Sequence, residues 1–494
     1  MEELTGEELP QAELTGESSL VGRVQGLRKP RRGDQIEVTV ERLDVRGRAC
    51  ASHSDDTGDY RVLLRNGIPG QRARVRVLKR RGHKLDCGVL EVLERAPGEV
   101  EPRCRLFGVC GGCSFQNLAY ERQLEFKHGM LVEVLAKAEL HVEVAPVLGA
   151  EDPWRYRNKM DFTFSTRRWI EDHEPEGAPQ GFGLGLHPSG QFRRVLDIES
   201  CVIQSELSDA ILCSARRIAL EQELEPWSIQ EHKGLLRHLV VRHASTGELL
   251  INVVTSTETP ELVPPYAAAL VAAHPEITTL VQTINERSGQ TAVGQHEVVL
   301  HGPGTIQETL HGLHFTLSAG SFFQTNSAQA ERLLDVILEE AQLQAGDVVH
   351  DLYCGAGAIG LACAAHVREV WGFEVVASAV RDGRANAQAN GIENIHFIAG
   401  DLAHEISNPS APAPDVCIID PPRAGLHPKV LGALGDLREA GARRLVYVSC
   451  NPRAAAGDVG ALVAKGWRLV RVRPVDLFPH TPHVETVLTL ERDA

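Results

Sequence analysis

Residues 347–357 read DVVHDLYCGAG, an apolar run that ends in an aspartate and a glycine-rich turn. Towards the C-terminus, helix-like segments alternate with four more strand-like runs, EVWGFEV, IHFIAGD, DVCIIDPP and RRLVYVSC. This alternation is typical of βαβ units, whose right-handed crossovers build a parallel sheet. We therefore expect an α/β domain over about residues 316–494, closed by two last strands in WRLVRVRPVDL and HVETVLTLER.

Acidic residues mark the carboxyl ends of the first three predicted strands. Asp351 precedes the turn Gly355–Gly357, Glu374 ends the second strand, and Asp401 follows the third. Ligands of parallel sheets bind beyond these ends, where glycines let the backbone approach closely. Glu374 is placed to accept both ribose hydroxyls of a nucleoside, and Asp401 to hold an adenine amino group. The pattern favours S-adenosylmethionine (SAM), although the turn also fits the G-x-G-x-x-G fingerprint of a dinucleotide site.

The ends of the fourth and fifth strands carry groups suited to base chemistry. The rigid turn DPPR places Asp420 where its carboxylate can bind the edge of a planar base, and VYVSCNP places Cys450 on the same side. Carbon 5 of a pyrimidine becomes nucleophilic only after addition at carbon 6, and a thiolate both adds and leaves readily. The proton on carbon 5 must then be removed. FPHTPHVE offers Glu485 as the first candidate base and His483 as the second.

The segment SFFQTN at 321–326 precedes the first helix of this domain. Its amide, Gln324, and its aromatic pair could stack on a flipped base and bind the base or SAM. The alternative is an aromatic pair that belongs to the core.

A cysteine cluster lies near the N-terminal third of the chain. Cys104, Cys110 and Cys113 form C-x5-C-G-G-C, and Cys201 is the best candidate for a fourth ligand. Glycines between ligands let backbone amides approach sulfur, as iron–sulfur clusters require. Zinc stays possible, although paired C-x2-C motifs are its commoner ligand pattern. The spacing is not the C-x3-C-x2-C of radical enzymes that cleave SAM.

Charge is distributed unevenly along the 494 residues. The formal net charge is −15, which by itself argues against a nucleic-acid partner. Residues 21–110, however, hold twenty Lys and Arg against twelve Asp and Glu, a net charge of +8. Five strand-like runs between residues 34 and 94 predict a small closed barrel, an architecture that often binds nucleic acid. Arg72, Arg74 and Arg76 alternate along one of these strands and should share one face.

Four regions are expected from these patterns: an acidic, disordered tail and linker (1–33), the barrel (34–94), a central domain (95–315) and the α/β domain (316–494). The chain shows no signal peptide and no apolar run long enough for a membrane span. We therefore expect a cytoplasmic protein whose cysteines are thiols or metal ligands.

The motifs FFQTN, DLYCGAG, DPPRAG, SCNP and FPHTPHVE, in this order and spacing, resemble those of the RNA uracil-5 methyltransferases, in particular those that act on 23S ribosomal RNA. YRNKMDF at 156–162 and CRLFGVCGGCSFQ at 104–116 are similar to segments of the same family, so the likeness covers about residues 34–494. It implies a Rossmann-like SAM-dependent methyltransferase domain behind an OB-like TRAM β-barrel and a central α+β iron–sulfur domain.

The resemblance also implies roles for individual residues. Cys450 would be the nucleophile and Glu485 the general base, acting on a uridine of 23S ribosomal RNA in a monomeric enzyme. Ala358 stands where the family often has Asn, so one contact to SAM is in doubt. SAM would be held by Gln324, Tyr353, Glu374, Asp401 and Asp420, and a 4Fe–4S cluster by Cys104, Cys110, Cys113 and Cys201.

Two alternatives remain from the sequence. The same chemistry could act on another 23S uridine or on the T-loop uridine of tRNA. A non-catalytic RNA-binding or redox-sensing iron–sulfur protein is the second alternative.

Overall fold

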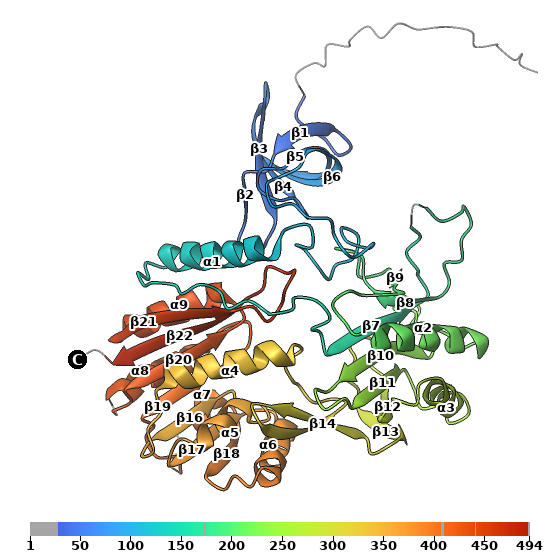
Figure 1. The fold of residues 1–494 in the computed structure, drawn as a ribbon. Coiled ribbons are helices and arrows are strands. Elements are labelled where there is room, and N and C mark those ends of the chain that lie inside the picture. Colours follow the sequence, from blue (N-terminus) through green and yellow to red (C-terminus); the bar gives the residue numbers. More distant parts are fainter. Residues whose placement is uncertain (1–27, 172, 407–409, 440, 493–494) are drawn as a thin grey trace, which may run out of the picture.

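The computed structural model describes residues 28–171, 173–406, 410–439 and 441–492. Residues 1–27, most of the acidic tail expected at 1–33, lie outside this description. The described strands form three larger sheets and one two-stranded sheet, arranged as lobes around a central gap in the ribbon (Figure 1). No helix in the described part of the chain is long and apolar enough to cross a lipid bilayer.

The C-terminal sheet confirms the predicted parallel α/β domain. Its strand order is β18-β17-β16-β19-β20-β22-β21, in which the first five strands are parallel and the last two antiparallel. Every residue of β16, β19 and β20 is buried, as expected for strands that helices cover on both faces. The strands are β16 (Val348–Leu352), β17 (Glu369–Glu374), β18 (Ile395–Ala399), β19 (Val416–Ile419), β20 (Arg444–Ser449), β21 (Trp467–Val475) and β22 (Glu485–Arg492). The helices are α4 (Ser327–Ala341), α5 (Ala358–Ala364), α6 (Ala377–Ala389), α7 (Leu402–Glu405), α8 (Pro428–Glu439) and α9 (Pro452–Val463).

The N-terminal sheet has six strands where five were expected. The run IEVTVERL is divided, because Val40 and Glu41 leave the ladder to bond Gln71 and Cys50 through their backbone amides. The strand order is β1-β5-β6-β4-β3-β2. Its strands are β1 (Gln35–Thr39), β2 (Arg42–Leu43), β3 (Ala49–Asp55), β4 (Gly58–Leu64), β5 (Arg72–Arg81) and β6 (Lys84–Glu94).

The middle sheet is mixed, with the order β13-β12-β11-β10-β7-β8-β9. Strands β10 and β11 form an antiparallel hairpin. Two helices, α2 (Glu206–Glu221) and α3 (Val263–Ala273), lie against this sheet (Figure 1). Its strands are β7 (Lys159–Ser165), β8 (Gly183–Leu186), β9 (Leu196–Asp197), β10 (Leu236–His243), β11 (Leu249–Thr255), β12 (Thr279–Ile284) and β13 (His296–His301).

Segments from before residue 316 complete the core of the C-terminal domain. Helix α1 (Tyr120–Lys137) packs its apolar residues, Met130 and Val134 among them, into the same core as Tyr447 of β20. The chain after α1 then runs parallel to β21 through the bridge Leu148–Val475. On the other face, the hairpin β14 (Thr305–Leu310) and β15 (Leu313–Ser318) joins the core under α4. The C-terminal α/β domain is therefore built from two separated stretches of chain, the segment around α1 and the continuous segment from β14 onwards, which begins before the predicted boundary at residue 316.

Candidate active site

The turn after β16 follows a backbone path that favours glycine. Gly355 and Gly357 have φ values of 55° and 86°, and Tyr353 enters the same left-handed region at 64°. The Glu374 carboxylate, at the end of β17, accepts bonds from the amides of Gly355 (3.0 Å) and Val376 (2.8 Å). The acidic residue and the glycine turn predicted from sequence are thus brought together.

Asp351 lies at the base of this turn and is fully buried. One carboxylate oxygen accepts a bond from the Gly360 amide at 2.8 Å, and the other has no hydrogen-bond partner. Burial, together with the nearby charges of Asp420 and Glu374, raises the pKa of Asp351 to about 7. Burial likewise raises the pKa of Asp420 to about 7.

Asp401 and Gln324 lie where the sequence predicted them, at loops beside the sheet. Asp401 follows β18, is exposed, and caps α7 by accepting the Ala403 amide at 3.0 Å. The backbone oxygen of Gln324 is held by Asn158 Nδ2 at 3.0 Å, so a residue of the YRNKMDF segment fixes this loop. The aromatic pair divides: Phe323 packs against Phe315 of the core.

Phe322, the other member of the pair, is 79% exposed. It remains available to a planar ligand, whereas its neighbour is a core residue.

Acidic residues gather at the carboxyl ends of neighbouring strands: Glu374 and Asp420, with the fully buried Asp351 next to them and Asp401 after β18. Such a set suits a ligand that brings hydroxyl and amino donors and a positive charge, as SAM does. The pyrophosphate of a dinucleotide would be repelled.

Cys450, at the end of β20, opens onto a separate pocket of about 620 Å³. Its walls come from distant parts of the chain: Val45 and Arg46, Gly111 and Gly112 with Ser114, Met130 and Val134 of α1, Arg423, and Thr481–Val484, which include His483. The glycines between Cys110 and Cys113 therefore form part of the wall opposite the candidate nucleophile.

The charges around Cys450 are coupled. Burial raises the pKa of the Cys450 thiol, and the carboxylate of Glu485 raises it further, whereas a hydrogen bond from Arg423 lowers it. Burial also raises the pKa of Glu485 to about 8, with Asp420 adding to the effect and Arg423 opposing it. Glu485 is only 5% exposed. Arg423 is thus the cation that lowers the pKa of both groups.

His483, the second candidate base, lines the same pocket. Burial lowers its pKa, and the cations Arg423 and Lys127 lower it further. The imidazole is therefore neutral at neutral pH.

The four predicted cysteine ligands lie within electrostatic range of one another. Burial raises the pKa of Cys113 to about 11 and that of Cys201 to about 12, and in both cases neighbouring thiolates of the set, Cys104 and Cys110, add to the shift. The Gly112 amide donates to Cys110 Sγ at 3.4 Å. Within the described ranges, no three His, Cys, Asp or Glu side chains are arranged to hold a metal ion.

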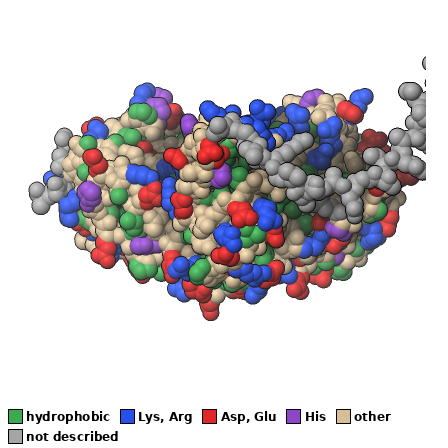
Figure 2. Space-filling view, turned by 90° about the horizontal axis from the view of Figure 1, so that it is seen from above, with side chains coloured by type: hydrophobic (Ala, Val, Ile, Leu, Met, Phe, Trp, Pro, Cys, Tyr) green, Lys and Arg blue, Asp and Glu red, His purple; other side chains and the backbone are tan. Residues whose placement is uncertain are grey.

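Two of the three arginines that share a face of β5, as predicted, are neutralised. Arg72 pairs with Glu94 at 2.7 Å, and Arg74 pairs with Glu91 at 2.5 Å. Glu37 contacts both guanidinium groups. Lys and Arg nevertheless gather in the upper middle of the face seen in Figure 2.

The sequence patterns do not identify three residues that lie in the pocket or behind its walls. Arg423 belongs to the DPPR turn, and no pattern assigns it a function. Gln123 and Lys127 lie on the buried face of α1 with Met130 and Val134, at helical spacing. A lysine on the apolar stripe of an amphipathic helix is an anomaly that requires a buried partner, and this signal could have identified Lys127.

This combination of fold and crevice defines an α/β, SAM-dependent methyltransferase. Residues 229–411 and 413–493 match the family described as tRNA (Uracil-5-)-methyltransferase. The chain therefore belongs to this family of SAM-dependent uracil-5 RNA methyltransferases.

Curated relatives from several bacteria match most of the chain. An uncharacterized RNA methyltransferase of Chlorobaculum tepidum is 38% identical over 481 residues, covering 94% of this chain and 97% of the relative. One from Porphyromonas gingivalis is 40% identical over 451 residues, covering 88% and 96%. The crystal structure of Pyrococcus abyssi tRNA (uracil-54, C5)-methyltransferase with S-adenosyl-L-homocysteine superposes with a TM-score of 0.71, at 25% identity, covering 92% of this chain and all of that one.

Proposed function

We propose that the protein methylates carbon 5 of a specific uridine in 23S ribosomal RNA through a covalent adduct between Cys450 and carbon 6. The observation that carries this proposal is the pocket in which Cys450, Arg423 and the loop leading to Glu485 meet beside the acidic crevice. A flipped base is required, because carbon 5 cannot be reached inside a stacked helix.

The residues divide the reaction between them. The Cys450 thiolate forms the bond from Sγ to carbon 6, which makes carbon 5 nucleophilic. SAM, when bound, supplies the methyl group that carbon 5 takes. The Glu485 carboxylate then removes the proton from carbon 5, the bond from carbon 6 to Sγ breaks, and Cys450 leaves as a thiolate.

The pKa values of both reacting groups are raised. Burial and the Glu485 carboxylate raise the pKa of Cys450, and burial and Asp420 raise that of Glu485 to about 8, so each group must lose a proton before it can act. Arg423 lowers both pKa values and so favours the thiolate before addition and the carboxylate before elimination.

Five residues would hold SAM. Glu374 would accept the ribose hydroxyls while its own position is fixed by the Gly355 and Val376 amides. Asp401 would bind the adenine amino group. Gln324, Tyr353 and Asp420 complete the set.

Cys104, Cys110, Cys113 and Cys201 would hold a 4Fe–4S cluster. Two features support this assignment: the mutual proximity of the four thiols, and hydrogen bonds to sulfur from Gly112 and, at Cys201, from the Ile203 amide. A cubic cluster binds one thiolate at each iron corner, so its ligands stand farther apart than those of a single ion. Visible absorbance with equal iron and sulfide in the purified protein would support the cluster, whereas zinc alone would exclude it.

The T-loop uridine of tRNA is the second candidate substrate. It is favoured by the likeness to the Pyrococcus enzyme, whose substrate is uracil 54 of tRNA. The 23S assignment is favoured by the likeness of the motifs FFQTN, DLYCGAG, DPPRAG, SCNP and FPHTPHVE to those of enzymes that act on 23S ribosomal RNA. The N-terminal sheet and the cysteine loop do not separate the two substrates, because the Pyrococcus enzyme matches 92% of this chain.

One experiment separates these substrates. The purified protein is incubated with SAM and, separately, with unmodified 23S RNA and tRNA transcripts, and 5-methyluridine is mapped by mass spectrometry. We expect a single modified uridine in 23S RNA and none with Cys450→Ala. Modification of tRNA alone would assign the second substrate, and no modification with no SAM binding would favour a non-catalytic RNA-binding protein.

A further inference from the structure

A buried ion pair ties helix α1 to the loop that leads to Glu485. Lys127 Nζ lies 2.6 Å from Asp476 Oδ1, and both side chains are fully buried. Asp476 directly follows β21, so the pair joins segments 349 residues apart in sequence. A buried ion pair contributes little stability compared with apolar residues of the same size. The main effect of the pair is therefore to fix the position of the loop after β21 relative to α1.

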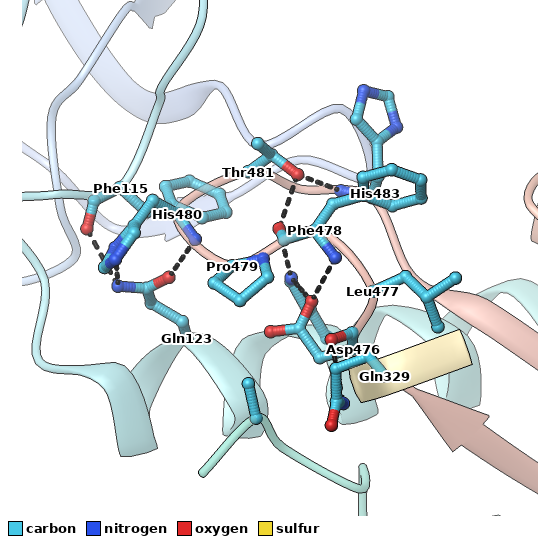
Figure 3. A network of polar contacts seen from close by, with 12 residues as sticks. Phe115, Gln123, Gln329, Asp476, Leu477, Phe478, Pro479, His480, Thr481 and His483 are labelled. Atoms are coloured by element: carbon cyan, nitrogen blue, oxygen red, sulfur yellow. Dashed lines mark hydrogen bonds and ion pairs between the residues drawn. The ribbon is translucent and has the colours of Figure 1, made fainter. Parts of the chain in front are cut away.

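Lys127 and Asp476 hold the first residues of this loop, which spans residues 476–484, through several hydrogen bonds. Asp476 Oδ1 also accepts the Phe478 amide at 3.1 Å, and Lys127 Nζ donates to the Phe478 carbonyl at 3.2 Å. The remaining oxygen, Asp476 Oδ2, accepts the Tyr120 hydroxyl at 2.9 Å. Figure 3 shows Asp476 and Phe478 joined in this way above α1.

Gln123, one helical turn before Lys127, holds the middle of the same loop. Its Oε1 accepts the His480 amide at 2.9 Å, and its Nε2 donates to the Phe115 carbonyl at 3.0 Å (Figure 3). The His480 carbonyl in turn accepts the Ser114 amide at 2.8 Å. Residues four apart on a helix share a face, so Gln123 and Lys127 act on the loop from one side.

Further hydrogen bonds extend along the loop from Phe478 towards Glu485. Thr481 Oγ1 donates to the Phe478 carbonyl at 2.8 Å and accepts the His483 amide at 3.2 Å (Figure 3). Glu485 follows two residues later, as the first residue of β22. Neither Lys127 nor Asp476 lines the pocket itself.

We propose that Lys127 and Asp476 are positioning residues that fix the loop of residues 476–484 so that Glu485 stands ready to remove the proton from carbon 5. This inference rests on the proposed function. Addition of Cys450 and methyl transfer do not use Glu485, whereas elimination does. Loss of the pair should therefore slow elimination selectively, and the methylated Cys450–RNA adduct should accumulate.

The test compares three variants with one matched control. Lys127→Met and Asp476→Asn each break the pair, and the double variant Lys127→Met/Asp476→Leu removes both charges so that neither is left buried alone. Lys137→Met makes the same change on the same helix, at an exposed lysine that pairs with Glu133.

Covalent adduct is measured on denaturing gels with uridine-containing RNA and SAM. Each value is divided by the number of active sites, counted by trapping with 5-fluorouridine RNA, in which fluorine replaces the proton that Glu485 would remove. Melting temperatures are recorded alongside. This normalisation separates slow elimination from partial misfolding, because misfolded protein traps neither RNA.

We expect roughly tenfold more adduct per active site in all three variants than in the wild type and Lys137→Met, since general base catalysis is worth at least that factor. The kcat and the KM for RNA should fall together, because the adduct accumulates after binding. Adduct that falls in parallel with the active-site count would overturn the inference, as would a double variant that eliminates as fast as the wild type. If the wild type traps no 5-fluorouridine RNA at all, the proposed covalent chemistry itself fails.

Discussion

The proposed SAM site and the Cys450 pocket are assembled in different ways. The crevice is built from the consecutive strand ends of β16, β17 and β18, so that Tyr353, Glu374 and Asp401 lie within about fifty residues. The pocket joins a turn at 45–46, the cysteine loop, the DPPR turn and the loop of residues 476–484. Local sequence order determines the first site, and long-range packing determines the second. Changes in the pocket should therefore alter turnover without altering SAM binding, and changes in the crevice should do the reverse.

Cys450→Ala should have the largest effect. Without the thiolate, carbon 5 is not activated, and we expect turnover to fall by on the order of 10⁴ or more. Methyl incorporation from labelled SAM measures this loss, and calorimetry should show wild-type affinity for SAM. A variant that loses SAM binding as well would mean that the two regions are not separable.

Glu485→Gln should reduce turnover by roughly 10²–10⁴, the usual contribution of a general base. Addition and methyl transfer should continue, so the adduct should accumulate on denaturing gels. Turnover close to that of the wild type would instead make His483 the base, and His483→Gln would then show the accumulation.

Glu374→Ala tests the proposed SAM site rather than the Cys450 pocket. The carboxylate organises the turn through Gly355 and Val376, and loss of hydrogen bonds to a charged group costs about 1.5–3 kcal/mol, or roughly ten- to hundredfold in SAM affinity. The measurement is the dissociation constant for SAM. At saturating SAM, the yield of 5-fluorouridine adduct should return to that of the wild type, and a persistent loss would contradict the division.

Arg423→Gln tests the charges inside the pocket. Because Arg423 lowers the pKa of Cys450 and that of Glu485, its removal should raise both. Both groups act in their deprotonated forms, so the rate should rise with pH in the wild type through about pH 8, and the variant's profile should move to higher pH. A shift of one unit corresponds to about a tenfold lower rate at neutral pH. The pH dependence of Cys450 alkylation checks the thiol separately, and Arg423→Lys should retain part of the effect.

Asp401→Ala should have the smallest effect. Asp401 is exposed, and one hydrogen bond to a neutral amino group is worth about 1 kcal/mol, or roughly fivefold in SAM affinity. Asp401 also caps the short helix α7, so thermal melting should accompany the binding measurement.

The difference between the two regions also explains what the sequence could predict. The parallel sheet, its glycine turn and the placement of Glu374, Asp401 and Cys450 follow from strand–helix alternation, because the carboxyl ends of parallel strands meet at one edge. The proximity of Gly111–Gly112 to Cys450 could not be predicted, since no local pattern relates segments that are more than three hundred residues apart.

The burial and pairing of single side chains are also beyond what the sequence predicts. Phe322 and Phe323 are adjacent and identical in sequence, yet only Phe323 enters the core. Arg72 and Arg74 were predicted as cations on one face, but the glutamates that neutralise them come from neighbouring strands, whose pairing the sequence does not specify.

The ion pair between Lys127 and Asp476 has a consequence for synthesis of the protein. The lysine leaves the ribosome 349 residues before its carboxylate does. At about 5–20 residues per second, this interval is on the order of tens of seconds, during which α1 lacks its charged partner and the apolar surface of the last strands. The N-terminal and middle sheets can form while translation continues, but the Cys450 pocket cannot close. The nascent chain should therefore fold its N-terminal and middle sheets well before it can modify a base.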